Sequence, residues 1–529
     1  MGRQEEEMSD QNRLIIAAVL MGAVLLVSWM LTGKGTGNGS ADAVQPDTAD
    51  VQETVTGPAT PEPDTLPPSP PDSTEESEFR DLTITVIVMD STGTPMVNAG
   101  ISTSGGAVTN WELIRYADMP GSGQTGNVNL AMRPWLVEKT DGEPVPFSWD
   151  GPDTVRVYGT TEIVLRGPGG IEKSFRFDAD FYGFLLERSG AGVMTILEGG
   201  IIPVSEQEAD TRRYYQAVWY AEKLKKKYSS SIDAEQPVGN VRWIGADSKY
   251  FAVILLPMSY ERVEGYVAPN DDQSPYVALD DRRVTVYAGP LSYSMLSALG
   301  RDTNQLVDFG WPIIRWIGRL IFWFSNSALG FVGNWGVRII LVSIVLKVLL
   351  WPLTTKSFSS MQKMQKVQPL MKELQEKYKG DPKRQQEALQ KLYREEGVNP
   401  LGGCLPLLLQ MPVFFALYRV LASAVELRGA PFVLWINDLS RPEILIPFGS
   451  KILGLSGLGL LAILMGVAFF VQQKMTSVSS QQKGMMYLMP ILMTWLFMRF
   501  PAGLTLYWFV NNILTIGQQE YIKLRLRRE

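Results

Sequence analysis

Long apolar stretches constrain the fold of this chain more than any other feature, because a run of about 20 apolar residues can cross a bilayer as a helix. The first run covers residues 14–32 and contains no charge. Five more follow in the second half of the chain, at residues 335–355, 403–424, 452–472, 485–499 and 502–517. The last two are separated only by a tight turn at Phe500 and Pro501, so we expect a helical hairpin there. The pattern predicts a polytopic α-helical membrane protein with six spanning helices.

The first apolar run has an alternative interpretation as a cleaved signal peptide, because Ala41 and Ala43 supply a small-residue site behind it. The acidic residues before the run, and its length, favour a membrane anchor that follows a short N-terminal segment, residues 1–13. Residues 33–78 contain many prolines, mostly acidic charge and no aromatic residue. Such a segment cannot bury enough apolar surface to offset its ordering entropy, so we expect a disordered linker.

Residues 79–304 have the sequence pattern of a β domain. Around residues 82–89, side chains alternate with the period of a strand. Further strand candidates lie at 153–158, 162–166, 171–177, 250–257 and 283–288. Antiparallel strands joined by turn residues predict a β-sandwich. We interpret the basic cluster from Lys223 to Lys227 as a solvated helix face and not as a binding patch.

Residues 305–332 combine several tryptophans with Arg315 and Arg319, which share one face of a helix. This composition is typical of an amphipathic helix that lies in the membrane interface.

Several absences exclude classes of chemistry. The sequence has no histidine, which excludes Ser-His-Asp catalysis, HExxH zinc sites and most transition-metal sites. Its single cysteine, Cys404, cannot form an intramolecular disulfide. No GxxxxGK[ST] phosphate loop is present, so nothing indicates a built-in ATPase of that type. We therefore expect no catalytic residue, no cofactor and no metal.

The distribution of Lys and Arg predicts the topology, because cytoplasmic loops are enriched in these residues. Residues 356–400, 473–484 and the tail 518–529 are basic, whereas the loop 425–450 and the turn 499–503 carry few basic residues. The pattern places both termini in the cytoplasm and the β domain outside.

The cytoplasmic segment 356–400 is predicted to be a helical hairpin. Its first arm has an apolar seam at spacings of three and four, as in a coiled coil, formed by Met364, Val367, Met371, Leu374 and Tyr378. Gly380 can end this arm, Asp381 can cap the next helix and Pro382 suits its first position. The alternative is a solvated connector without a role of its own.

Polar groups inside a bilayer are costly and often mark function. None of the predicted spans contains Asp or Glu, which weighs against proton-coupled transport, and Lys347 is the outstanding group. It could extend past Trp351 to the cytoplasmic interface. Alternatively, it is a cation in a polar groove open to the cytoplasm and lined by Gln410 and polar groups of other spans. At an effective dielectric constant of ~20, a carboxylate ~4 Å away would gain about 4 kcal/mol, against about 1 kcal/mol in water.

Several short motifs occur in the second half of the chain, namely Phe331 to Gly336, Trp351 to Thr354, Asn399 to Cys404, Gln410 to Pro412, and Phe500 to Leu504 with Tyr507. Together they resemble those of the YidC membrane protein insertases, of the YidC/Oxa/Alb family. The anchor, linker and outer β domain are similar to the Gram-negative form. The resemblance implies a five-helix insertase core, a periplasmic β-supersandwich and a location in the bacterial inner membrane.

The resemblance also implies a substrate groove. Lys347 stands where the family often has arginine, and Gln410 matches a groove glutamine. The predicted groove consists of Lys347, Gln410, Ser343, Trp351, Trp508 and Asn512. Replacing arginine by lysine keeps the charge and loses the rigid fork of donors. The cytoplasmic hairpin resembles the family's mobile receiving element.

The function implied is the insertion and folding of integral membrane proteins, alone or with the secretion translocon. It requires no covalent chemistry, so we do not expect an enzyme. The implied partners are nascent membrane proteins, the lipid bilayer, the translocon and, through the basic tail, the ribosome, without sequence-specific nucleic-acid binding. The rival interpretations are a secondary transporter with a periplasmic accessory domain and a periplasmic module on a passive anchor.

Overall fold

The computed structural model describes most of the chain from residue 81 onward. The described ranges are 81–117, 127–131, 133–140, 142–189, 195–197, 215–228, 231–259, 263–269, 276–398, 405–476 and 483–528. The predicted N-terminal segment, first span and linker, like Cys404, lie outside these ranges. The described part of the chain divides into two compact units, one of which lies within residues 78–369 and 396–529 and the other within residues 370–395.

The first sheet of the β domain has five strands in the order β4-β3-β2-β1-β7. These strands are β1 (Thr83–Met89), β2 (Pro95–Ser102), β3 (Ala107–Ala117), β4 (Asn127–Asn129) and β7 (Thr154–Val157). Strand β1 pairs antiparallel with β2, with Val86 opposite Ala99, and parallel with β7. A small ribbon of β5 (Lys139–Thr140) and β6 (Glu143–Pro144) lies in the connection before β7.

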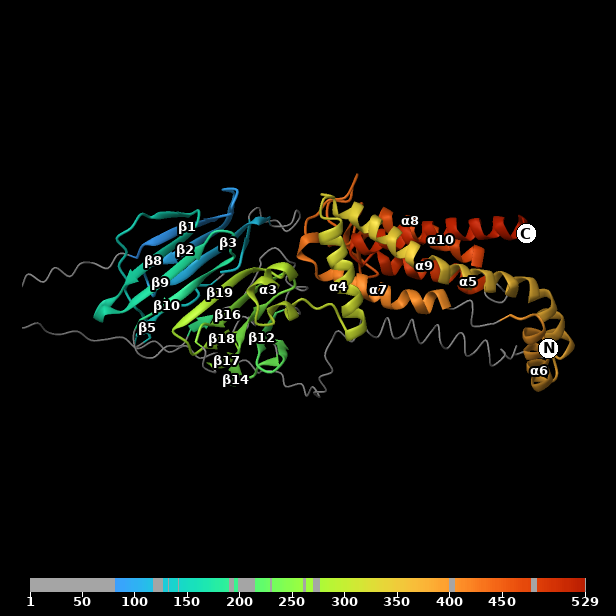
Figure 1. Cartoon of the computed structure of the whole chain (residues 1–529), viewed down its shortest axis with the longest axis horizontal. Helices are drawn as coiled ribbons and strands as arrows, with labels where there is room; N and C mark the ends of the chain where they lie inside the picture. Colours follow the sequence, from blue (N-terminus) through green and yellow to red (C-terminus); the bar gives the residue numbers. More distant parts are fainter. Residues whose placement is uncertain are drawn as a thin grey trace, which may run out of the picture. The chain divides into compact units, whose positions relative to one another are not determined.

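The second sheet has eight strands in the order β13-β12-β15-β16-β19-β10-β9-β8 (Figure 1). Their bounds are β8 (Thr160–Arg166), β9 (Glu172–Asp178), β10 (Gly183–Arg188), β12 (Gln216–Tyr220), β13 (Leu224–Tyr228), β15 (Trp243–Asp247), β16 (Phe251–Pro257) and β19 (Arg283–Pro290). A third sheet of four strands contains β11 (Thr195–Leu197), β14 (Gln236–Val241), β17 (Val263–Ala268) and β18 (Tyr276–Leu279). The predicted strands at 153–158, 162–166, 171–177, 250–257 and 283–288 correspond to β7, β8, β9, β16 and β19.

One apolar core joins the first sheet to the second. Trp111 of β3 lies against Phe177 and Phe184, and its indole Nε1 donates to the carbonyl of Ala288 in β19 at 2.8 Å. Alternate residues of β1 point into this core, as the period of two in the sequence predicts. The β-sandwich architecture follows from this packing of one sheet face on another.

The interpretation of Lys223 to Lys227 as a helix face is wrong. Residues Leu224–Tyr228 form strand β13, which pairs with β12 at the edge of the eight-stranded sheet. Lys226 forms an ion pair with the buried Asp247 of β15 at 2.9 Å. Lysine is only mildly disfavoured in strands, so the pairing with β12 decided the outcome.

Between the β domain and the spans lie α3 (Tyr293–Leu299), a short 3-10 turn at Thr303–Leu306 and α4 (Pro312–Trp323). Helix α4 exposes Trp316 and buries Phe322, so it has one exposed apolar face, and its position in the membrane interface stays a prediction. It packs against α7 and continues into one turn of π-helix at Phe324–Ala328.

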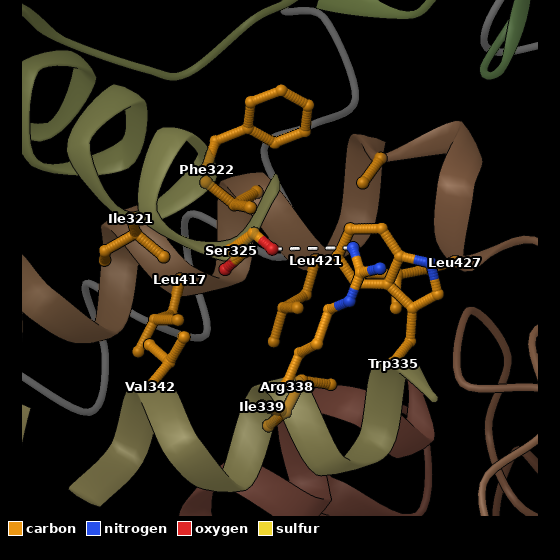
Figure 2. Close-up of a pocket in the computed structure, with 12 residues that line it drawn as sticks. Ile321, Phe322, Ser325, Trp335, Arg338, Ile339, Val342, Leu417, Leu421 and Leu427 are labelled. Atoms are coloured by element: carbon orange, nitrogen blue, oxygen red, sulfur yellow. Dashed lines mark hydrogen bonds between the residues drawn. The ribbon is translucent and has the colours of Figure 1, made fainter. Parts of the chain in front are cut away.

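The side chain of Arg338, which belongs to α5, is hydrogen-bonded to this π-turn and to the loop after it (Figure 2). Its guanidinium donates to the carbonyls of Ser325, Gly330 and Val332 and lies 4.5 Å from the ring of Trp335. The neighbouring cavity between α4, α5 and α7 measures about 10 Å³, so these helices pack closely.

The remaining helices are α5 (Trp335–Lys377), α7 (Leu405–Ser423), α8 (Leu460–Thr476), α9 (Lys483–Phe497) and α10 (Ala502–Arg528). Helix α8 packs against both α9 and α10 (Figure 1). Among the described residues, α5 is the one helix that is both long and apolar enough to cross a membrane, and Leu460–Met475 and Tyr487–Phe497 are shorter apolar helices. The count of six spans therefore stays a prediction.

Some predicted element boundaries differ from the structure. The second span and the first arm of the cytoplasmic hairpin form one helix, α5, with Pro352 and Pro369 inside it. The fourth span begins at Leu460 and not at 452, because β20 (Ile446–Ile452) and β21 (Leu455–Leu458) form a hairpin. Glycine and proline are frequent in this segment and disfavour a helix there.

The second unit contains the last turns of α5 and helix α6 (Pro382–Glu395). The carboxylate of Asp381 accepts a hydrogen bond from the backbone N–H of Arg384 at 3.1 Å, which caps α6. The side-chain amide of Gln385 donates to the carbonyl of Gln375 at 3.1 Å and holds the two helices together. Of the predicted seam, Met371, Leu374 and Tyr378 belong to this unit and are half-buried, whereas Met364 and Val367 are buried in the first unit.

Candidate functional site

Lys347 lies on α5 with its side chain directed at α10. Its side chain is only 8% exposed, and its Nζ donates to the Thr515 hydroxyl at 2.7 Å. Thr515 in turn donates to the carbonyl of Asn511, one turn earlier on α10, at 2.6 Å. An ammonium group that reached the interface would be exposed, so this conformation is that of a lysine held between two helices.

The contact between α5 and α10 continues as a polar seam toward the C-terminal end of α10. The side-chain amide of Gln518 donates to the hydroxyls of Thr354 at 2.8 Å and Thr355 at 3.2 Å. Beyond it the contact becomes apolar, where Phe358 and Met361 pack on Ile522. The polar groups between α5 and α10 are therefore concentrated in one stretch around Lys347.

Helix α10 adds buried amide atoms to this seam. Asn512, Thr515 and Gln519 lie three and four residues apart and so share one face of the helix. Among the residues that the structure describes, Asn512 Nδ2, Gln518 Oε1 and both amide atoms of Gln519 are buried and have no hydrogen-bond partner. A buried unpaired polar group costs about 1–3 kcal/mol. The seam therefore has unused capacity to bind a polar ligand.

Gln410 of α7 lies at a different level of the bundle. Its amide donates to the hydroxyl of Tyr507, which is buried on α10. Tyr507 and Thr515 are separated by about two turns, or ~12 Å at ~1.5 Å per residue. Gln410 and Lys347 are thus bonded to the same helix through different residues, and the structure records no hydrogen bond between them.

The other predicted groove residues have contacts of their own. Ser343 is buried on α5 and donates to the carbonyl of Ile339 in the same helix at 2.7 Å. The ring of Trp351 lies 6.2 Å from that of Tyr521 on α10. The ring of Trp508 lies 5.0 Å from Phe414 and 5.3 Å from Phe497 in an aromatic cluster. Of the six predicted groove residues, Lys347 and Asn512 belong to the polar seam.

The sequence-based prediction did not include Gln518 and Gln519, because it ended the sixth span at residue 517, and it passed over Thr515 although this residue lies within that span. Helix α10 continues to Arg528 without a break. Polar residues recur with helical spacing at positions 511, 512, 515, 518 and 519, and this period was available in the sequence. Within the described residues, no group of His, Cys, Asp and Glu could hold a metal ion.

Comparison with known protein families covers most of the chain. Residues 91–324 match the family model of the YidC periplasmic domain, and residues 327–529 match that of the 60Kd inner membrane protein. The chain belongs to the YidC family of membrane protein insertases. In that family's terms, the β domain is the periplasmic domain and the helices form the inner-membrane region.

Individual relatives agree with this placement, and each is described as membrane protein insertase YidC. The Syntrophobacter fumaroxidans protein is 42% identical over 53% of this chain, so the matched part spans about half of that relative's length. The Geobacter sulfurreducens protein is 32% identical over 81% of this chain and 85% of its own length. The Syntrophus aciditrophicus protein is 30% identical over 87% of each chain.

One solved structure is also similar to this chain, at a TM-score of 0.37 and 20% sequence identity. It is described as an active YidC insertase crystal structure with the first transmembrane domain resolved. The match covers 80% of this chain and 90% of the other.

Proposed function

We propose that this protein inserts other proteins into the inner membrane, and that the polar seam between α5 and α10 receives the hydrophilic flank of the substrate. The single observation that carries the proposal is the buried ammonium group of Lys347. It has one hydrogen-bond partner among the described residues, the Thr515 hydroxyl, and no carboxylate partner there. In the proposed topology both termini are cytoplasmic and the seam opens toward the cytoplasm.

The charge of Lys347 would attract an acidic flank. An ammonium group has three donors, and Thr515 takes one of them. In a partly dry site with an effective dielectric constant of ~20, a carboxylate ~4 Å away gains about 4 kcal/mol. The unpaired amides of Asn512 and Gln519 can bond to the backbone of the same flank. The seam would therefore shorten the path of polar groups through hydrocarbon.

The apolar segment of the substrate supplies the driving force. As it leaves water and slides along α7 and α9 into lipid, it gains roughly 25 cal/mol for each Å² of apolar surface that is buried. The membrane potential adds about 2.3 kcal/mol per charge per 100 mV and favours acidic flanks that move outward. No bond is made or broken, so we propose no catalytic residue.

The unit that contains α6 is proposed to meet the incoming chain first. Its surface is rich in lysine and arginine, and its half-buried Met371 and Leu374 offer apolar surface. The last turns of α5, the helix that carries Lys347, belong to this unit. The secretion translocon and the ribosome are proposed partners, the latter through Arg525 and the other basic residues after it.

A complementation experiment tests the proposal. Lys347→Glu is expressed in cells depleted of their own insertase, alongside Lys347→Arg and the matched charge reversal Lys356→Glu, an exposed lysine of the same helix. We expect Lys347→Glu to lose growth support at normal protein level and both controls to retain it. Stalled nascent chains should crosslink to α7 and α9. Growth with Lys347→Glu, together with nascent chains that never reach these helices, would reject the proposed seam.

A further inference from the structure

Two leucines in the connection between α7 and α8 adopt an unusual backbone conformation and are highly exposed. Leu434 has φ 56° and is 82% exposed, and Leu453 has φ 51° and is 80% exposed. Positive φ is uncommon for residues with a bulky side chain, and glycine or asparagine usually occupies such positions. The surrounding structure must therefore hold both leucines in place, with their side chains projecting outward.

Leu434 lies in a turn that is fastened to the start of α5. The N–H of Phe432 donates to the carbonyl of Ile436 at 2.9 Å, which closes the turn. The side-chain amide of Asn334 donates to the carbonyl of Phe432, also at 2.9 Å. The residue after Asn334 is Trp335, whose ring lies under the Arg338 guanidinium (Figure 2).

Leu453 lies at the tip of the β20–β21 hairpin, which is fastened to the end of α9. The guanidinium of Arg499 donates to the carbonyl of Leu453 at 2.7 Å and lies 4.1 Å from the ring of Trp495. At the base of the hairpin, the carboxylate of Glu443 accepts hydrogen bonds from the first two N–H groups of α8 at 3.0 Å each.

Each turn is thus held next to an arginine–tryptophan pair at the end of an apolar helix. The Leu453 turn is bonded to Arg499 itself, and the Leu434 turn is bonded to Asn334, the residue before Trp335. Tryptophan and arginine at helix ends mark the level of the lipid headgroups. A side chain that projects from this level meets the boundary between headgroups and hydrocarbon. Neighbouring apolar side chains in the same two loops are also exposed, namely Val433, Ile444, Leu445, Ile446 and Ile452.

We propose that Leu434 and Leu453 insert into the leaflet that surrounds this end of the helices and fasten the connection between α7 and α8 to lipid. This leaflet is the outer one in the topology of the proposed function, and the lipid contact itself does not depend on that orientation. Lipid is the occupant favoured by the structure, because the two turns are attached to different helices, α5 and α9. The exposed apolar side chains are divided between these two turns, and Leu434 and Leu453 are the most exposed of them, whereas a stable protein partner requires a broad continuous face.

The inserted leucines would hold the ends of α5 and α9 at a fixed depth. Lys347 lies several turns further along α5, so the polar seam could open while the opposite end of the bundle stays in position. The two turns would therefore support the opening of the polar seam without contacting the substrate.

The test measures the depth of each leucine in a bilayer. Cys404→Ser removes the natural thiol from the full chain, and single cysteines are then introduced as Leu434→Cys and Leu453→Cys. Asn437→Cys and Ser456→Cys, at exposed polar positions of the same two loops, are the matched controls. Each variant carries a polarity-sensitive fluorophore and is reconstituted, one copy per nanodisc, in phosphatidylethanolamine and phosphatidylglycerol.

Two quenchers then separate the possible environments. We expect a lipid with a spin label high on its acyl chain to quench the fluorophore several-fold more strongly at positions 434 and 453 than at the controls. Iodide in the water should show the reverse order. If iodide quenches the fluorophore at positions 434 and 453 as strongly as at the controls, the two turns lie in water. Protection from both quenchers would show that protein covers positions 434 and 453. Either result overturns the proposal.

A second pair of variants covers the case in which the fluorophore perturbs the turns. Leu434→Asn and Leu453→Asn keep a residue that tolerates positive φ and remove the apolar side chain. We expect faster amide hydrogen exchange across residues 429–459 in nanodiscs, and unchanged exchange would count against insertion. Neither measurement requires insertion activity, so failure here leaves the proposed function standing, and loss of the proposed function leaves the depth measurement valid.

Discussion

Among the residues that the structure describes, two lysines are buried, one in the β domain and one in the helical region, and their surroundings differ. Lys173 of β9 is 1% exposed, and its ammonium donates to the backbone carbonyls of Gly105 and Leu136. Lys347 of α5 is 8% exposed and donates to a single side-chain hydroxyl. Burial is therefore nearly the same, and the type of partner is not.

The partners of Lys173 are fixed parts of the β-sandwich. The backbone wraps closely around the side chain, and a Cβ at Gly106 would lie 2.9 Å from Lys173 Cδ. The φ of 54° at Gly106 also favours glycine at this position. A ligand could reach this ammonium only by unfolding the domain, so Lys173 has a structural role.

The partner of Lys347 is a hydroxyl that can rotate away, and buried amides with unused donors lie on the same helix face. Burial of a charge therefore does not by itself identify a functional site. The distinguishing property is whether the neighbouring polar groups are saturated, because only an unsaturated site can bind another molecule without breaking the fold.

Replacing each lysine by methionine should give opposite results, and this is the largest effect that we expect. Lys347→Met should abolish complementation at normal protein level, because the charge that attracts the substrate is lost. Lys173→Met should retain insertion per folded molecule and lower the free energy of unfolding by about 1–3 kcal/mol, because the carbonyl of Leu136 loses its donor. Growth assays and denaturant unfolding of the β domain measure the two effects. Loss of insertion by Lys173→Met without loss of stability would contradict the structural role of Lys173.

The pH dependence of the free energy of unfolding should contain a contribution from Lys173. Burial lowers the pKa of its ammonium from 10.5 to about 7. Between these values the unfolded chain binds a proton that the folded chain does not, so this group makes the free energy of unfolding rise with pH, by up to ~1.4 kcal/mol per pH unit. Below pH 7 both states are protonated and the slope disappears. Denaturant unfolding of wild type and Lys173→Met across this window should show that the variant loses the slope, and an equal slope in both would exclude Lys173 as its source.

Thr515→Val should have the smallest effect. It tests whether the Thr515 hydroxyl competes with a substrate for the Lys347 ammonium. The substitution removes the hydroxyl that competes with a substrate carboxylate for the ammonium. A net hydrogen bond contributes ~1 kcal/mol, so an acidic peptide should bind about fivefold more tightly to the purified protein. Thr494→Val is the matched control, because the Thr494 hydroxyl donates to the carbonyl of Pro490 in its own helix. Weaker binding by Thr515→Val would mean that Thr515 positions the ammonium and does not compete for it.

Much of the β domain could be predicted from the sequence. Alternating apolar residues at 82–89 and the turn at Gly167 to Gly170 are local signals, and the strands β1, β8 and β9 follow them. The strand at Lys223 to Lys227 could not be predicted in this way, because lysines carry no periodic apolar signal. The hairpin at 446–458 was missed for the opposite reason, since its apolar residues imitate a membrane span.

From the sequence alone, Lys347 could be recognised as an energetically costly charge within an apolar helix, and motifs before and after it indicated the family. Each of these signals lies in a short stretch of the chain. The packing of the folded chain was needed to show that Lys347 bonds to Thr515, that Gln410 bonds to Tyr507 and that Arg499 bonds to the carbonyl of Leu453. These partners are far apart in sequence, and hydrogen bonds form wherever packing brings donors and acceptors together, so no local pattern specifies them.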